Sequence, residues 1–257
     1  MKLVKNSFEI IETDLKPSEV SIIPKLINNI KFPEYVTIYL KISDKDSFKG
    51  DYVNSKHSVS IFKWNGPFKS QYKVFYITTT LKELLDNDWL DDLKYICEPT
   101  EYHEKRVCIK FNVSKGLVPE FTKYKQFDFQ IEQQYKNPSF IIPDWLDIPE
   151  DDYEIEEEEE YEGIEDIICY AASDEKWDTQ DLKVVAFLKA CDDAEYNYYT
   201  LINQGLNYYQ AKELLPDNIK IELTMIGYIS DWKFFFEYSS SQIQKLIKPL
   251  KEYYGNN

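Results

Sequence analysis

The sequence has no stretch of about 18 apolar residues, so we expect no membrane-spanning helix. Its opening residues, MKLVKNSFEIIETD, contain no apolar run long enough for a secretory signal peptide, and we therefore expect a cytoplasmic protein. Glycine is scarce, with 7 in 257 residues, and there are only 2 histidines. We find no internal repeat. What remains is a chain that is 43% hydrophobic, which is enough to bury a core in one large domain or two small ones.

The cysteines lack the spacing of a metal site. None of the four forms a CxxC pair, and no histidine lies near them at the spacing that zinc ligands show. They are Cys97, Cys108, Cys169 and Cys191. The pattern favours reduced, buried thiols over disulfides or a metal centre, and we expect no metal.

Most of the negative charge is local. The net charge is −16, and the stretch from Glu150 to Asp166 contributes twelve acidic residues without any Lys or Arg, so the other residues together carry −4. The remaining surface offers no basic footprint for nucleic acid. We interpret residues 149–166 as a solvated acidic loop, with a segment that binds a protein partner, or a nucleic-acid mimic, as the alternatives.

Strand signals dominate the first 80 residues. β-branched and aromatic runs predict strands that are separated by Pro33, by Lys49-Gly50-Asp51 and by Asn65-Gly66-Pro67. The predicted strands are Phe8–Glu12, Val36–Ile42, Val59–Trp64 and Lys73–Thr78, with a later one at Arg106–Val113. Leucine spacing predicts a helix over Thr80–Leu93, and Val118–Tyr135 also suits a helix.

Helical signals dominate the last third. Asp178 or Thr179 suits the N-cap of a helix that runs to about Asn203, and Gly205 suits its C-terminal cap. The face expected to be buried holds Leu182, Val185, Leu188, Cys191, Ala194, Tyr198 and Leu201. Further helices are predicted to begin after Asn207, after Asp217 (through about Glu237) and over Gln242–Tyr254. Strands first and helices last predict an α+β fold, with a mostly antiparallel sheet packed against helices.

Three stretches resemble the flavin-dependent thymidylate synthases, in particular a bacterial and phage branch of that family. They are rich in Trp, Pro and His, so chance identity is a poor explanation. The stretches are Trp89–Val113, Phe140–Leu146 and Leu215–Phe236. The resemblance covers roughly residues 1–10 and 73–254, and it implies a single domain of this family over residues 1–257.

The reaction of this family determines which ligands such a site must bind. FAD, reduced by NADPH, carries a methylene group from methylenetetrahydrofolate to dUMP, which gives dTMP. No side chain acts as a covalent nucleophile, so the protein must hold two polyanionic ligands face to face. Arginine serves this purpose best because its guanidinium fork matches phosphate geometry. Orientation is expected to contribute more to the rate than acid–base catalysis.

This sequence departs from the family where those ligands would bind. In the segment that matches the family's Arg-His-Arg motif, lysine replaces both arginines, at Lys123 and Lys125, and Tyr124 replaces the histidine. Asp128 stands where the family has serine, while Glu132 is kept. The vestigial FAD positions are thus Lys123, Tyr124, Lys125 and Glu132, and the vestigial dUMP positions are Glu120, Glu132, Lys212 and Ser239. A flavin-contacting histidine falls on Tyr35.

Each change weakens the binding of an anion. Lysine keeps the charge but loses the bidentate fork, and each lost charge-assisted bond costs roughly 1.5–3 kcal/mol. The pattern predicts a protein that keeps the fold and loses the reaction. A divergent enzyme that still uses FAD, with Lys123, Lys125, Glu132 and Lys212 as its ligand groups, is the alternative. His103 is expected to be structural. The resemblance also implies a homotetramer.

Overall fold

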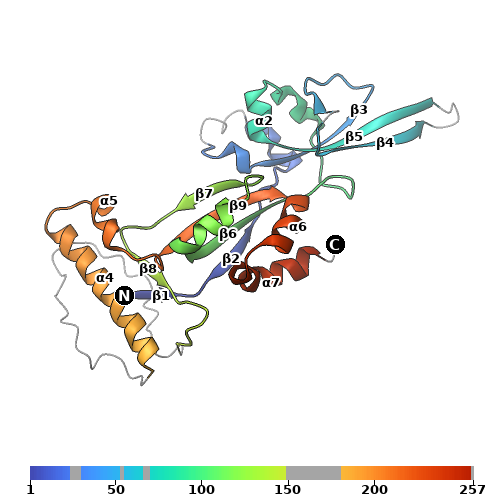
Figure 1. The fold of residues 1–257 in the computed structure, drawn as a ribbon. Helices are drawn as coiled ribbons and strands as arrows, with labels where there is room; N and C mark the ends of the chain where they lie inside the picture. Colours follow the sequence, from blue (N-terminus) through green and yellow to red (C-terminus); the bar gives the residue numbers. More distant parts are fainter. Residues whose placement is uncertain (24–29, 53–54, 66–69, 149–180, 256–257) are drawn as a thin grey trace. The chain divides into compact units, whose positions relative to one another are not determined.

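The computed structural model describes residues 1–23, 30–52, 55–65, 70–148 and 181–255 (Figure 1). Its contacts divide the chain into two compact units. Unit 1 comprises Met1–Phe8, Phe111–Lys123 and Ile131–Leu223, and unit 2 comprises Glu9–Lys110, Tyr124–Gln130 and Thr224–Asn257. The acidic loop 149–166 and Cys169 lie outside the described residues. A single domain over residues 1–257 stays a prediction.

Strands and helices mix as an α+β fold requires, with antiparallel strand pairing in the three-stranded sheet, which confirms the expected fold class. The strands are β1 (Lys2–Val4), β2 (Ser7–Ile11), β3 (Thr37–Ser43), β4 (Ser58–Asn65), β5 (Ser70–Thr80), β6 (Arg106–Ser114), β7 (Asp128–Glu132), β8 (Ser139–Ile141) and β9 (Lys220–Tyr228). The α-helices are α2 (Leu81–Asp86), α3 (Val118–Thr122), α4 (Leu182–Asn203), α5 (Tyr208–Ala211), α6 (Ile229–Tyr238) and α7 (Ser241–Gly255). Short 3-10 helices occupy Pro17–Ile22 (η1), Pro33–Tyr35 (η3), Leu90–Tyr95 (η5), Lys115–Leu117 (η6) and Lys212–Leu214 (η9).

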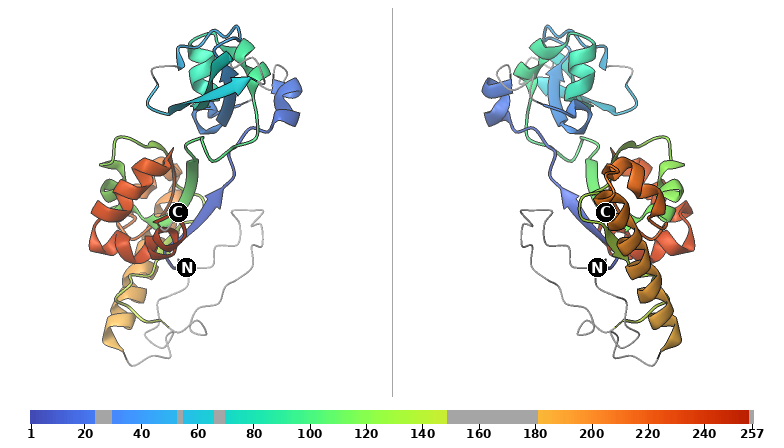
Figure 2. Two further views of the ribbon diagram at one scale, coloured as in Figure 1. Left: turned by 90° about the vertical axis from the view of Figure 1, so that its right-hand side faces the viewer. Right: turned by 90° about the vertical axis from the view of Figure 1, so that its left-hand side faces the viewer.

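Unit 2 contains an antiparallel sheet of order β3-β5-β4, so β5 is the central strand. One face of this sheet is apolar because alternate residues of β3 and β5 point to the same side. Ile38, Leu40 and Ile42 lie on this face opposite Thr79, Ile77 and Phe75. The helices α2 and η5 add their leucines to the same core. In Figure 2 the short helices that follow β5 are drawn beside this sheet.

A buried carboxylate fixes the loop that follows β3. Asp92 in η5 is fully buried, and it accepts hydrogen bonds from the backbone N–H groups of Lys49 and Gly50 and from the hydroxyl of Tyr52. Gly50 is required there because a Cβ would lie 2.1 Å from the Tyr52 ring. Three donors therefore compensate a charge that burial alone would make costly.

The helix predicted over Thr80–Leu93 is interrupted. α2 begins after Thr80, whose hydroxyl accepts a hydrogen bond from the backbone N–H of Glu83. It ends at Asp86, because Asp88 adopts a positive φ of 59°, and a 3-10 helix follows. Aspartate tolerates this left-handed conformation better than most residues, which makes it a suitable helix stop.

Two further helix predictions were wrong. Val118–Tyr135 is helical only to Thr122, and β7 follows at Asp128–Glu132. The helix expected from Asp217 is instead strand β9, and helix α6 begins at Ile229. Both segments belong to a four-stranded sheet of order β2-β6-β9-β7. β9 lies inside that sheet and is almost entirely buried, so pairing with neighbours on both sides overrides its local helix propensity.

The other C-terminal helices are confirmed. α4 begins at Leu182 with Asp181 as its N-cap, in place of the expected Asp178 or Thr179, which lie outside the described residues. Gly205 has the positive φ, 92°, that a C-terminal cap needs. The buried face of α4 is made by Val184, Leu188, Cys191 and Tyr198, whereas Leu182, expected on that face, is 81% exposed.

The core of unit 1 brings α4 together with the N-terminus. β1 pairs in parallel with β8, and Leu3 and Phe140 pack with Leu188 of α4. Cys97, Cys108 and Cys191 are free, and burial raises the pKa of Cys108 and of Cys191 to about 11. No helix in the described part of the chain is long and apolar enough to cross a membrane.

Candidate functional site

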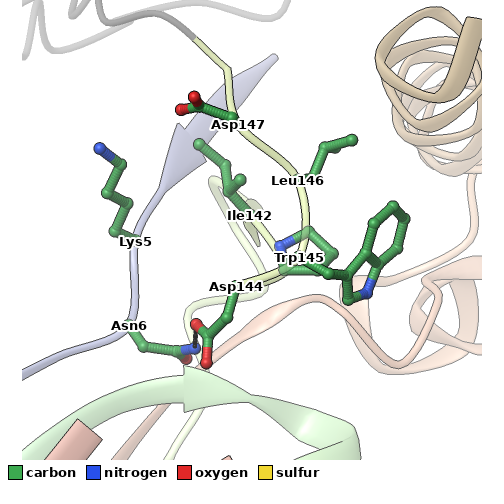
Figure 3. A pocket seen from close by; sticks show the side chains of 8 residues that line it. Lys5, Asn6, Ile142, Asp144, Trp145, Leu146 and Asp147 are labelled. Carbon is green, nitrogen blue, oxygen red and sulfur yellow. Dashed lines mark hydrogen bonds between the residues drawn. The ribbon is translucent and has the colours of Figure 1, made fainter. Parts of the chain in front are cut away.

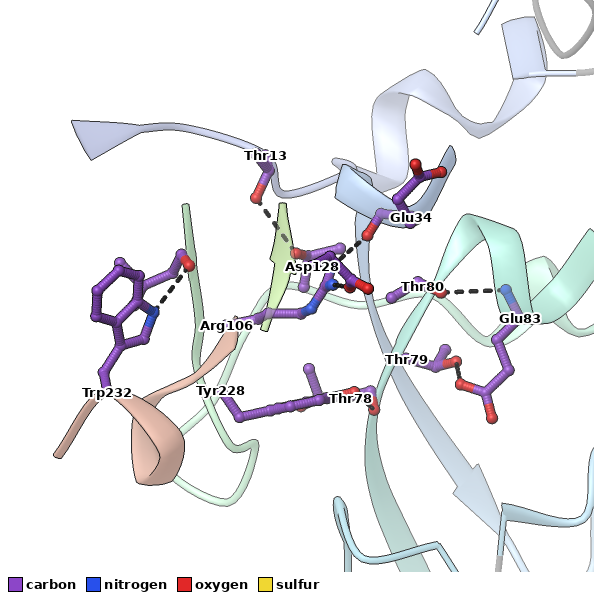
Figure 4. A network of polar contacts seen from close by, with 12 residues as sticks. Thr13, Glu34, Thr78, Thr79, Thr80, Glu83, Arg106, Asp128, Tyr228 and Trp232 are labelled. Carbon is purple, nitrogen blue, oxygen red and sulfur yellow. Dashed lines mark hydrogen bonds and ion pairs between the residues drawn. The ribbon is translucent and has the colours of Figure 1, made fainter. Parts of the chain in front are cut away.

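The chain contains one arginine, Arg106, and it lies at the centre of a polar cluster in unit 2 (Figure 4). Arg106 begins β6 and is only 6% exposed. Its Nη2 lies 2.7 Å from Oδ2 of Asp128, and its Nη1 donates a hydrogen bond of 2.5 Å to the backbone carbonyl of Glu34. Side chains and backbone of the same chain thus take the positions where an external anion would contact the guanidinium.

The remaining sides of the guanidinium face protein as well. Its central carbon lies 5.8 Å from the ring centre of Tyr228, within the range of a cation–π contact. The Nε atom of Arg106 is buried without a hydrogen-bond partner. Because the guanidinium already lacks one hydrogen bond, losing its contact with Asp128 or with the Glu34 carbonyl is expected to destabilise the fold more than it otherwise would.

Two positions singled out by the family resemblance meet at Arg106. Asp128 pairs with it directly, and Tyr35 ends η3 next to Glu34, whose carbonyl accepts the other hydrogen bond. Burial raises the pKa of Tyr35 well above its ordinary value, and the nearby charges of Asp128 and Arg106 act on it too. Sequence reasoning passed over Arg106 itself, although a lone arginine beside the degenerate motif was a usable signal.

A second polar pair, His57 and Glu104, also lies near Tyr228. His57 Nδ1 lies 2.7 Å from Glu104 Oε2, and the His57 ring stacks on Tyr228 with 3.3 Å between ring centres. Burial raises the pKa of Glu104, but hydrogen bonds from His57 and Ser230 outweigh it, so the pKa lies below its ordinary value. We made no assignment for His57 from sequence, and the contact joins positions 47 residues apart.

His103 has the structural role that we expected. It is buried, its Nδ1 accepts a hydrogen bond from the Thr100 backbone, and its Nε2 lies 3.1 Å from the carbonyl of Leu40. Burial lowers its pKa, so the neutral ring is favoured. Both ring nitrogens are therefore used in holding residues 97–103 against β3.

The degenerate motif itself is largely engaged within the chain. Lys123 is the C-cap of α3 and forms an ion pair of 2.8 Å with Glu120, one turn earlier. Tyr124 is buried, its hydroxyl donates to the carbonyl of Tyr238, and its ring meets Phe235 edge-on at 5.0 Å. Lys125 is exposed.

The other vestigial positions lie on several elements. Glu132 ends β7 and is exposed. Lys212 begins η9, with its ammonium 5.2 Å from the ring centre of Tyr135. The hydroxyl of Ser239 accepts a hydrogen bond from Gln244. Glu120, Lys123, Glu132 and Lys212 belong to unit 1, and Tyr124, Lys125 and Ser239 belong to unit 2.

These groups fit a phosphate-binding cradle poorly. A cradle needs donors that converge and have no internal acceptor. Here Lys123 already binds a carboxylate, Tyr124 is part of the core, and the only guanidinium in the chain is paired with Asp128. Lys123, Tyr124 and Arg106 are therefore engaged by other parts of the chain, and we derive no catalytic step through FAD or dUMP.

A surface hollow of about 400 Å³ lies elsewhere in unit 1 (Figure 3). It is bounded by Lys5 and Asn6 on one side and by residues 142–147 on the other, and Asn6 donates a hydrogen bond to Asp144. Trp145 is 70% exposed at its rim. Residues 142–146 belong to the stretch Phe140–Leu146 that resembles the family, but none of the ligand-binding positions predicted from the sequence lines the hollow. In the described part of the chain, no three His, Cys, Asp or Glu side chains are grouped so as to hold a metal ion.

No protein-family model matches the sequence, and no curated protein matches it. The solved structures that resemble the fold include two of a UMP/dUMP methylase, PolB, from Streptomyces cacaoi. The complex with 5-Br dUMP has 11% sequence identity and a TM-score of 0.46, and the match covers 100% of this chain and 93% of that chain. The complex with 5-Br UMP has 12% identity and a TM-score of 0.46, over 99% and 91%. Likeness at this level carries no argument about activity, so function must be argued from the residues.

Proposed function

We propose that this chain is a distant relative of the flavin-dependent thymidylate synthases that does not methylate dUMP and acts through binding to other molecules. The sequence resemblance over Trp89–Val113 and Leu215–Phe236 supports the kinship. The loss of the reaction follows from the state of the charged groups that the family reaction requires.

One observation carries the proposal: the only arginine of the chain is buried, and both of its terminal nitrogens bind groups of its own chain. Two phosphate-bearing ligands need several charge-assisted contacts, and each is worth roughly 1.5–3 kcal/mol. A ligand phosphate would have to displace Asp128, which is held at high effective concentration because it belongs to the same chain. About 1.4 kcal/mol corresponds to a tenfold change in affinity. Competition with Asp128 therefore weakens the binding of a free anion to Arg106 by orders of magnitude.

Absorption of the purified protein tests this directly. We expect a colourless protein without the flavin bands, and no change in flavin fluorescence when FAD is titrated with it. Unfolding temperature is expected to stay constant with FAD or dUMP. A yellow preparation whose FAD persists through gel filtration would refute the proposal.

A working flavoenzyme with altered ligand contacts is the competing function. The exposed ammonium of Lys125 and the retained charge of Lys212 favour it, because both could still meet a phosphate. Its assay is tritium release from 5-labelled dUMP in the presence of NADPH, FAD and methylenetetrahydrofolate. Release that disappears in Lys125→Ala and Lys212→Ala, but persists in the exposed control Lys248→Ala, would establish it.

Self-association belongs to the proposal as well. The family resemblance implies a homotetramer, and sedimentation velocity of the full chain measures this independently of any ligand.

A further inference from the structure

The two edge strands of the β3-β5-β4 sheet, β3 and β4, differ in the backbone hydrogen bonds that their outer sides make. The outer edge of β3 is covered: Thr37 exchanges backbone hydrogen bonds with residues 13 and 15, and Tyr39 accepts one from Cys97. Bridges Asp14↔Thr37 and Leu40↔Ile96 lie on this same edge. The outer edge of β4 has no such cover, since residues 59–65 make backbone hydrogen bonds only to β5 within the described part of the chain.

An uncovered edge strand of this length is unusual. β4 has 8 residues, and the part of it that pairs with residues 70–73 extends beyond β3, whose register ends at Ser43↔Val74. Unpaired N–H and C=O groups on such an edge can accept another extended chain as an additional strand. Proteins usually shorten or cover these edges, as this fold does at β3.

The side chains of β4 give its two faces different chemistry. Phe62 and Trp64 are 56% and 66% exposed on the face that continues the apolar core, where the ammonium of Lys73 in β5 lies 5.1 Å from the ring centre of Phe62. On the opposite face, Lys63 lies 5.8 Å from the ring centre of Tyr76, which Lys41 approaches to 6.0 Å. A strand that added to β4 would place alternate side chains beside the aromatic rings and beside the lysines.

The positive charge of residues 58–80 favours an acidic segment as the strand that pairs with β4. Residues 58–80 contain three lysines and no Asp or Glu, although the whole chain has 46 acidic residues and a net charge of −16. A second copy pairing through β4 would bring lysines of like charge together, which is destabilising. A polyanion such as nucleic acid would meet only a few lysines on a protein that is acidic elsewhere.

We propose that the outer edge of β4 binds an extended segment of a partner protein, in which acidic residues alternate with aromatic or β-branched ones. The acidic side chains face Lys63, and the apolar ones pack on Phe62 and Trp64. Backbone hydrogen bonds supply the common part of the affinity, and the alternation supplies the specificity. The inference stands apart from the proposed loss of catalysis: a protein that binds FAD would refute that proposal and leave this one intact.

The test uses the full chain and a fluorescein-labelled synthetic peptide of twelve residues in which Glu alternates with Val and Tyr. Fluorescence anisotropy is expected to show saturable binding that weakens as salt is added, because the charges are exposed. A matched peptide with Lys in place of Glu, and one N-methylated along one edge of the backbone, are expected to bind at least tenfold more weakly.

Variants locate the site. Trp64→Ala and Lys63→Glu are expected to weaken binding of the Glu peptide by tenfold or more. Tyr253→Ala and Lys248→Glu, at exposed positions of α7, serve as controls and are expected to change it less than twofold. Far-UV circular dichroism verifies that each variant is folded.

Several results would overturn the inference. They are absence of saturable binding, equal binding of the Lys and Glu peptides, and unchanged affinity in both β4 variants. A dimer that is lost in Trp64→Ala would assign the edge to a second copy instead. Tighter binding of a single-stranded DNA oligonucleotide than of the peptide, again lost in Trp64→Ala, would assign it to nucleic acid.

Discussion

The pair between Arg106 and Asp128 offers the sharpest test of whether the chain itself closes its guanidinium to external anions. The change is Asp128→Ser, which removes the carboxylate and restores the residue type that the family resemblance places there. The Arg106 side chain is 3% exposed and its Nε already lacks a partner, so the variant leaves a buried charge with one remaining hydrogen bond.

The magnitude follows from the burial of the two partners. Removing one partner of a fully buried ion pair costs about 3–5 kcal/mol. The Asp128 side chain is 54% exposed, so water screens the pair and replaces part of what is lost. We therefore expect a loss of roughly 1.5–3 kcal/mol, the range for hydrogen bonds to charged groups. In urea this lowers the unfolding midpoint by about 1 M, given a slope of about 2 kcal/mol per M.

Inorganic phosphate separates electrostatics from simple loss of packing. In the variant the guanidinium is free to bind an oxyanion, so phosphate is expected to restore stability, by roughly 2.7 kcal/mol at about 100 times its dissociation constant. The parent protein is expected to show no such gain. Asp217→Ser is the matched control, since that side chain is 82% exposed and 3.8 Å from Lys115, and it should cost less than about 1 kcal/mol.

Two outcomes would contradict this reasoning. If Asp128→Ser unfolds at the same urea concentration as the parent, the pair does not stabilise the fold. If phosphate stabilises the parent as strongly as the variant, Asp128 does not exclude anions from Arg106.

Three further predictions concern unit 2, each measured by urea unfolding. Asp92→Ala removes the acceptor of three hydrogen bonds at a fully buried site and is expected to lower the free energy of unfolding by about 3 kcal/mol. Asp92→Asn is expected to lower it by less. Equal stability of the two variants would count against the role of the carboxylate. Glu104→Gln is expected to destabilise the protein near neutral pH, because a carboxyl whose folded pKa is lowered stabilises the fold above its unfolded pKa. The difference in stability between Glu104→Gln and the parent should disappear as the pH falls below 4.5, the ordinary pKa of a glutamate, and then through the lower pKa of Glu104 in the folded protein. A difference that persists in acid would assign the effect to packing against His57. Gly227→Ala puts a Cβ 2.4 Å from the Phe127 ring and is expected to cost about 1–3 kcal/mol through overpacking, so an unchanged midpoint would mean that the ring moves freely.

Local signals were sufficient for much of the secondary structure. Breakers and β-branched runs placed β2, β3, β4, β5 and β6 within a few residues of their bounds. Gly205 and Asn207 identified a helix end and a helix start because their cap geometry depends on neighbouring residues only. Such signals are encoded within one turn of the chain, so no tertiary information is needed to interpret them.

The misread segments share a physical cause. Lys220–Tyr228 has apolar residues at a spacing that either a strand or a helix could bury, and its place inside a sheet decided for the strand. Residues 128–132 were likewise assigned to a helix because Phe121, Tyr124 and Phe127 lie about one helical turn apart, and the pairing of β7 with β9 decided for the strand. The resemblance did point to Asp128 and Tyr35, but it gave no sign that Arg106 lies between them.

The sequence by itself determined the composition-level facts: one arginine, an acidic stretch, an α+β pattern, and lysines where a related family has arginines. Only the tertiary structure decided what the remaining charges do. Folding brings Arg106 within 2.7 Å of Asp128, leaves the outer edge of β4 without backbone partners among the described residues, and joins His57 to Glu104. These contacts join residues far apart in the chain, and their strength depends on burial, which no local pattern encodes.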